Sequence, residues 1–205
     1  MGQDNVHENG KRRRVTEEEF KKVVKVVSSV IGDMLKLVWY TAMRPYEVCD
    51  MKPSDILKDD KDCWIYIPGR DESPFGNHKT TRFERVRVIP MTKESQKILK
   101  PRLRGLDPTE YVFKPAEATK IINKKIRDKY DHNSFCRAVK RGCKRADVDV
   151  FVPYDLRRTT ATGTRAILGK EAAKVLLGHT KTDTTDIYLL EEVQEAMKVA
   201  KALSS

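Results

Sequence analysis

The stretch DCWIYIPGRDESPFGNHKTTRFERVRVIP, residues 62–90, decides the fold class, because it interrupts a sequence otherwise patterned for helices. Trp64–Ile67 and Val86–Ile89 have the β-branched and aromatic composition of strands, and the second segment alternates apolar with basic residues. Glycine, proline and asparagine residues punctuate the segment between them. The stretch therefore predicts a long antiparallel hairpin, which makes the protein mainly α with one small antiparallel sheet (α+β).

Helical patterns lie on both sides of this hairpin. Residues 16–19 (TEEE) form a capping box that starts a helix, for which Gly32 is the expected break. An apolar helix is expected over Asp33–Met43, and Pro45 opens a short helix through Met51. Further helices are expected over Lys93–Leu99, Pro115–Lys129, Ser134–Arg145, Asp155–Leu168, Glu171–Leu177 and Leu190–Leu203, with Asp155 as an N-cap.

Length and charge limit the classes of protein that fit. With 205 residues, 39% of them hydrophobic, the chain has enough apolar material for one domain with a real core. The formal net charge of +11 favours a polyanionic partner, most often nucleic acid, because the charge of nucleic acid supplies most of its sequence-independent affinity. Charge alone leaves open a basic protein with no such partner.

Residues 1–14 are predicted to be a flexible basic lead-in to the domain at 15–205. The lead-in ends in a cluster that contains Arg12, Arg13 and Arg14. Two interpretations remain open for this cluster, namely a solvated group of charges and a contact with the DNA backbone.

The cysteines Cys49, Cys63, Cys136 and Cys143 form no CxxC pair and have no neighbouring cluster of metal ligands. A structural zinc site is therefore not expected, and reduced thiols in a cytoplasmic protein are the simplest interpretation. No apolar run reaches membrane-spanning length, and no secretory leader is recognisable, so no membrane contact is expected.

Four short motifs contain residues that could carry chemistry. Each has an ordinary structural explanation when taken alone: Arg44 can pair with Glu47 one turn on, Lys79 can be a loop lysine, and Tyr188 can be a packing residue. The motifs are TAMRPYE (41–47), HKTTRFERVRVIP (78–90), YDLRRTTAT (154–162) and LGHTKTDTTDIY (177–188).

Together, in their order and spacing, the four motifs resemble those of the tyrosine recombinase (phage integrase) family. The resemblance runs from about residue 15 to 200. It implies the catalytic-domain fold of that family and an enzyme that cleaves and rejoins DNA by transesterification, through a 3′-phosphotyrosine intermediate. It implies no metal and no ATP, because the phosphotyrosine conserves the energy of the broken bond.

The resemblance also assigns roles to individual residues. Two guanidinium groups would clamp the charge that develops on the phosphate, and Glu47 would orient the first of them. A lysine at the tip of the hairpin would protonate the departing 5′ oxygen, a histidine would assist as base or phosphate donor, and a tyrosine would be the nucleophile. The two guanidinium groups are those of Arg44 and Arg157. The lysine is Lys79, the histidine is His179, and the nucleophile is Tyr188.

The chain departs from the family pattern at two positions of the third motif. Tyr154 stands where most members have histidine, and it can hydrogen-bond a phosphate but cannot shuttle protons near neutral pH. Altered efficiency, rather than lost activity, is therefore expected. Arg158 stands where a second histidine often follows the arginine, and a structural or backbone-contact role is expected for it. His78, Arg82 and Arg85 of the hairpin are further candidates for DNA contact.

Family members usually have a helical core-binding domain before the catalytic domain, and the first helix expected here starts near residue 16. The chain is accordingly expected to be either a piece of a longer protein or a stand-alone catalytic domain. We expect weak, salt-sensitive binding to double-stranded DNA, a monomer in solution, and a homotetramer on DNA for a full-length protein.

Three rival functions remain open from the sequence. The first is a decayed recombinase that only binds DNA, with Tyr154 as the sign of lost catalysis. The second is a type IB topoisomerase-like enzyme that relaxes DNA without strand exchange. The third is a purely structural basic protein.

Overall fold

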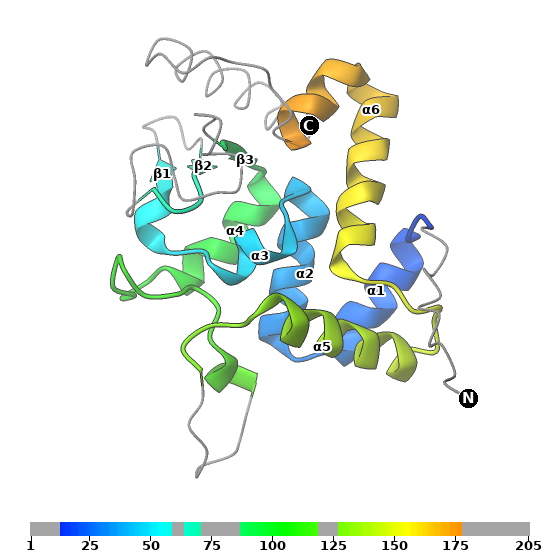
Figure 1. Ribbon diagram of the computed structural model, residues 1–205, viewed down its shortest axis with the longest axis horizontal. Coiled ribbons are helices and arrows are strands. Elements are labelled where there is room, and N and C mark those ends of the chain that lie inside the picture. Colours follow the sequence, from blue (N-terminus) through cyan, green and yellow to red (C-terminus); the bar gives the residue numbers. More distant parts are fainter. Residues whose placement is uncertain (1–12, 59–63, 71–86, 119–126, 178–205) are drawn as a thin grey trace, which may run out of the picture.

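The central element of the fold is the apolar helix α2 (Ser29–Thr41). The computed structural model describes residues 13–58, 64–70, 87–118 and 127–177 (Figure 1). Apolar residues on all sides of α2 are buried, as expected of a helix enclosed by neighbours. Those neighbours include α1 (Glu17–Val26), α3 (Pro45–Cys49), α4 (Lys93–Arg102), α5 (His132–Arg145) and α6 (Pro153–Leu177).

The first helix starts at the predicted capping box. The Glu19 amide donates to Thr16 Oγ1 over 3.2 Å, and the Thr16 amide donates to Glu19 Oε2 over 2.8 Å. The expected break at Gly32 is wrong, because its amide donates to the carbonyl of Ser28 and belongs to the first turn of α2. The chain bends instead at Val27 and Ser28, which have extended backbone angles.

The small sheet has the order β1–β2–β3 and is antiparallel throughout. The predicted pairing of two strands across the hairpin is confirmed: β2 (Trp64–Tyr66) lies beside β3 (Ile89–Met91), with Ile65 opposite Pro90. β3 starts later than the predicted Val86–Ile89 and contains Pro90, which an edge strand tolerates. β1 (Ile56–Lys58) was not predicted.

The helix expected over Pro115–Lys129 is wrong in its described parts. Pro115–Ala118 form a short 3-10 helix (η3), and residues 127–130 are not helical. Glu117 accepts the Lys114 amide and pairs with Arg102, so its carboxylate caps one short turn. Another short 3-10 helix, η1 (Pro53–Asp55), precedes β1.

The two helices expected over 155–177 form one bent element, α6, with Gly169 at the bend (φ 87°, ψ 178°). The second limb turns back toward the sheet (Figure 1). Asp155 is not the N-cap, because the helix begins at Pro153. Its Oδ2 instead accepts the Val152 amide over 2.9 Å, from inside the first turn.

These elements confirm the predicted class, mainly α with a small antiparallel sheet. Within the described ranges, no helix is long and apolar enough to cross a membrane. Over the same residues, no group of three or more His, Cys, Asp or Glu side chains is placed to hold a metal ion. Cys49, Cys136 and Cys143 are free thiols; Cys49 and Cys143 are buried, whereas Cys136 is only partly so.

Candidate active site

Glu47 is a fully buried carboxylate at the start of α3. Its Oε2 accepts the backbone amide of Arg44, the N-cap residue, over 2.5 Å. Its Oε1 accepts from the Arg44 side chain over 3.0 Å, which is the ion pair expected from the sequence. Pro45 at the first helical position sets the backbone for this turn. The local structure of one short helix therefore orients Arg44.

Arg87 reaches the same carboxylate from the other side. It lies two residues before β3 and only 2% of it is exposed. Its Nε donates to Glu47 Oε1 over 3.1 Å, and both terminal nitrogens are 3.3 Å from the carbonyl oxygen of Leu176 in α6. Arg87 thus joins α3 to the last turn of α6, two elements far apart in sequence.

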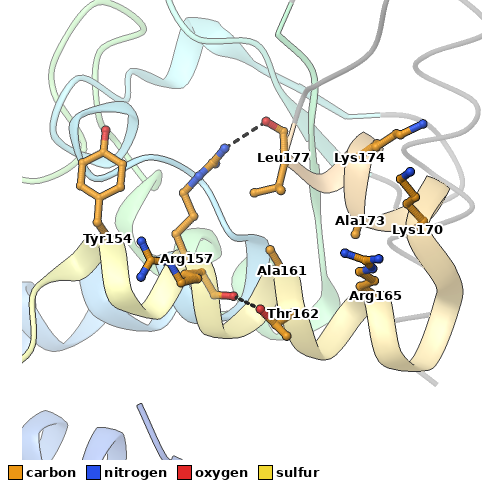
Figure 2. A pocket seen from close by; sticks show the side chains of 10 residues that line it. Tyr154, Arg157, Ala161, Thr162, Arg165, Lys170, Ala173, Lys174 and Leu177 are labelled. Carbon is orange, nitrogen blue, oxygen red and sulfur yellow. Dashed lines mark hydrogen bonds between the residues drawn. The ribbon is translucent and has the colours of Figure 1, made fainter. Parts of the chain in front are cut away.

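Arg157 projects from the first limb of α6 and is 6% exposed. One terminal nitrogen donates to the carbonyl of Ala42, the residue that ends α2 with a left-handed φ of 50°. The other donates to the carbonyl of Leu177 over 3.0 Å (Figure 2). The side chain therefore ties the two limbs of α6 to each other and to the end of α2.

Positive charge predominates among the described residues of this cluster. The guanidinium groups of Arg44, Arg87 and Arg157 surround one carboxylate. Burial, and next the charge of Arg87, lower the pKa of Arg157 to about 10, so the side chain remains cationic at neutral pH. A buried cluster with surplus fixed cations is suited to hold an anion such as a phosphate.

A pocket of about 610 Å³ opens beside Arg157, between the two limbs of α6 (Figure 2). Tyr154 stands at one side of it with 42% of its surface exposed, and the His132 ring contacts the Tyr154 ring edge-on at 5.7 Å. The pocket is open, and every charged residue of its lining is basic. Its lining consists of Tyr154, Arg157, Arg158, Ala161, Thr162, Arg165, Lys170, Ala173, Lys174 and Leu177.

The structure brings together four of the residues predicted from the motifs. Arg44, Glu47 and Arg157 form the buried cluster, and Tyr154 lies at the adjoining pocket. The other catalytic candidates, Lys79, His179 and Tyr188, lie outside the described residues. So do Arg12, His78, Arg82 and Arg85, predicted to contact DNA, and the helix expected over Leu190–Leu203.

Three predicted DNA contacts do fall within the described residues. Arg14 and Arg158 are exposed. Arg13 instead pairs with Glu19 over 2.8 Å and donates to the carbonyl of Asp149 over 2.7 Å. Its guanidinium therefore fastens the chain before α1 to the loop that precedes α6.

Arg87 is the residue of the cluster that sequence reasoning did not single out. An alternation of apolar and basic residues is usual for a strand with one solvated face. The signal that could have identified it is its position, since an arginine directly before the Val88-Ile89-Pro90 run of a buried strand needs a partner.

Known structures share this fold, which is that of tyrosine recombinase catalytic domains. A crystal structure of XerA recombinase matches with a TM-score of 0.56 and 21% identity, over 89% of this chain and 62% of that chain. The Tn1549 transposon integrase, solved in complex with circular intermediate DNA, matches with a TM-score of 0.57 and 16% identity, over 89% of this chain and 67% of that one.

The chain belongs to the phage integrase family, whose model matches residues 13–195. A tyrosine recombinase of Thermosipho africanus is 28% identical over 82% of this chain and 52% of its own length. Tyrosine recombinase XerA of Pyrococcus horikoshii is 28% identical over 94% of this chain and 63% of its own length. The chain thus spans between half and two thirds of these relatives.

Proposed function

We propose that the chain is the catalytic domain of a site-specific DNA recombinase, which cleaves and rejoins DNA through a covalent bond to Tyr188. The observation that carries the proposal is the cluster of Arg44, Glu47 and Arg157, assembled from two segments that are far apart in sequence. Arg44 and Arg157 are the arginines that the family motifs assign to the phosphate. The match to the phage integrase family supports the same chemistry.

The two arginines act on the phosphate in this proposal. Attack at phosphorus concentrates negative charge on the two non-bridging oxygens, and fixed guanidinium donors stabilise that charge without reorganising. A guanidinium has five N–H groups, and the two carbonyls that Arg157 contacts do not use all of them. The remaining N–H groups can donate to the phosphate. Glu47 holds the Arg44 side chain in place for the same task.

Tyr188 is the proposed nucleophile. Its phenol oxygen forms a bond to phosphorus while the bond to the 5′ oxygen breaks, and the leaving oxygen takes its proton from Lys79. His179 assists by accepting the phenol proton or by donating to the phosphate. Rejoining is the reverse reaction with a 5′ hydroxyl as nucleophile, so the number of phosphoester bonds is conserved and no ATP or metal is required.

The proposed partner is double-stranded DNA, in keeping with the net charge of +11 and the open basic pocket beside Arg157. A homotetramer on DNA is proposed for a full-length protein and a monomer for this chain alone. We place the protein in the cytoplasm, where it has access to DNA.

A nicked suicide duplex tests the proposal. Its cleavage releases a short fragment, which traps the enzyme on DNA, so wild-type protein should give an SDS-stable adduct that Tyr188→Phe does not give. Absence of the adduct at every salt concentration and pH would instead indicate a module that only binds DNA. Relaxation of supercoiled plasmid without joining of two sites would indicate a topoisomerase.

A further inference from the structure

All three side-chain nitrogens of Arg87 form polar contacts, so the residue does more than fill space in the core. Its Nε is 3.1 Å from Glu47 Oε1, and that same oxygen is 3.0 Å from the Arg44 side chain. Its two terminal nitrogens both face the Leu176 carbonyl at 3.3 Å. The planar, forked shape of a guanidinium allows this double contact, which the single ammonium of a lysine cannot reproduce.

Because Arg87 and Glu47 are buried, the relative position of their side chains is closely constrained. Their side chains are 2% and 0% exposed, so each charge depends on protein partners rather than on water. Any displacement of Arg87 therefore moves the Glu47 carboxylate with it. Since Glu47 also binds Arg44 through its side chain and backbone, the displacement reaches the guanidinium proposed to bind the phosphate.

The other end of the Arg87 contact lies where the second limb of α6 ends. The carbonyls of Leu176 and Leu177 are adjacent in sequence, and each is held by a different arginine, Arg87 and Arg157, respectively. Carbonyls at the C-terminal end of a helix carry partial negative charge, so a guanidinium near them is favourable. The motif that contains His179 continues directly from this point in the sequence.

We infer that Arg87 is a positioning residue, which sets the Arg44–Glu47 pair in register with the end of α6 where Arg157 is also anchored. The inference rests on the proposed function. Arg87 acts through Glu47 and through the Leu176 carbonyl, and the two arginines of the clamp are thereby held at one spacing. Removing it should impair the chemical step far more than the binding of DNA.

Single-turnover cleavage of the suicide duplex tests the inference in Arg87→Gln and Arg87→Lys. The rate of adduct formation should fall at least about 100-fold in Arg87→Gln, because small misplacements in an active site have effects of that size. The dissociation constant for the duplex, measured in the Tyr188→Phe background, should change less than about threefold. Arg87→Lys keeps the charge without the fork and should recover part of the rate.

Arg102→Gln is the matched control. Arg102 is also largely buried, with 13% exposure, and pairs with Asp33 and Glu117, away from the cluster. Its loss should lower the thermal midpoint yet leave the cleavage rate within about twofold. If Arg87→Gln cleaves as fast as Arg102→Gln, the inference is wrong. If Arg87→Gln does not fold, Arg87→Lys decides, and full activity in that variant counts against the inference.

A spectroscopic measurement separates this inference from the proposed function. In ¹H–¹⁵N spectra, the Nε–Hε signals of Arg44 and Arg157 should shift in Arg87→Lys and stay in place in Arg102→Gln. Unchanged signals in Arg87→Lys would overturn the inference. The measurement needs no activity, so a wild-type chain that forms no adduct would refute the proposed function and still leave this result decisive.

Discussion

At the scale of single residues, the most informative departure from the family pattern is Tyr154. It is 42% exposed at the pocket, beside Arg157 in the same helix, and its ring contacts His132. The position is therefore open to a phosphate, and the residue there can donate a hydrogen bond. A histidine at this position would add the ability to exchange a proton near neutral pH.

Replacing Tyr154 by histidine should raise the rate of adduct formation about tenfold or more, since general acid–base catalysis contributes effects of this size or larger. The exposed position makes the stability change small, within about 0.5 kcal/mol. The measurement is single-turnover cleavage of the suicide duplex between pH 6 and 9. Tyr154→Phe is the control, and equal rates for His and Phe would show that this position takes no part in proton transfer.

At the scale of elements, the bend in α6 brings the Leu177 carbonyl to Arg157. Gly169 makes the bend with φ 87° and ψ 178°, a region essentially restricted to glycine. The first limb ends there, and the second returns over the pocket (Figure 2). The backbone conformation of Gly169 thus determines whether the Leu177 carbonyl can accept the hydrogen bond from Arg157.

Gly169→Ala should lower the free energy of unfolding by about 1–3 kcal/mol through backbone strain alone, because no atom would obstruct the new methyl group. Gly163→Ala is the matched control in the same helix. It also meets no atom, has no positive φ, and should raise stability by about 0.5–1 kcal/mol. Urea unfolding of both variants gives the comparison, and equal midpoints would rule out strain at Gly169.

The contact between α1 and α5 depends on a different glycine. A Cβ on Gly142 would lie 2.5 Å from Val27 Cγ1 and 3.1 Å from Val23 Cγ1. Gly142→Ala should therefore overpack this contact and lower the free energy of unfolding by about 1–3 kcal/mol. The pair Gly142→Ala and Val27→Ala should recover stability relative to the single glycine variant, as urea unfolding can measure; no recovery would place the strain elsewhere.

At the scale of the whole molecule, one half-buried and one buried tyrosine make stability depend on alkaline pH. Burial is the largest cause that raises the pKa of Tyr46 to about 12 and of Tyr130 to about 12. A raised folded-state pKa means that the folded state retains its proton where the unfolded state has lost it. The stabilisation is complete below the unfolded pKa, near pH 10, and is lost as the pH rises toward 12.

The urea midpoint should consequently begin to fall above about pH 8.5, because burial also raises the pKa of the Cys49, Cys136 and Cys143 thiols, and it should fall more steeply above about pH 10 as the tyrosines of the unfolded state ionise. Absorbance at 295 nm should show tyrosines that ionise about two pH units later than free tyrosine. Tyr130→Phe should remove part of the fall without affecting the cluster around Glu47. A midpoint that does not decline up to pH 11.5 would contradict the assignment of these buried phenols.

The exposed arginines at the pocket lead to a prediction about the salt dependence of DNA binding. Arg158 and Arg165 are exposed at the pocket beside Arg157. If each neutralises one phosphate, replacement by glutamine should weaken DNA binding and reduce the slope of log K against log salt by about 0.9. Lys22→Gln, exposed on α1, is the control and should leave the slope unchanged. Equal slopes for all three variants would remove this face from the DNA interface.

The sequence was sufficient for much of the fold and for the pairing of Arg44 with Glu47. The capping box at Thr16, the proline start of α3 and the hairpin pairing of β2 with β3 are local or nearest-neighbour features, and they were predicted. The ion pair of Arg44 with Glu47 was predicted for the same reason, since the two residues are three apart at the start of α3.

The tertiary structure decided what depends on long-range contacts. The break expected at Gly32 was wrong because the Gly32 amide donates to Ser28 within the first turn of α2. The helix expected over 115–129 was wrong in its described parts, where Glu117 pairs with Arg102 of α4. The role of Arg87 depends on a carbonyl 89 residues away. The sequence by itself determined which charged residues match the family motifs, and the packing of α3, β3 and α6 determined which charged residues hold one another in place.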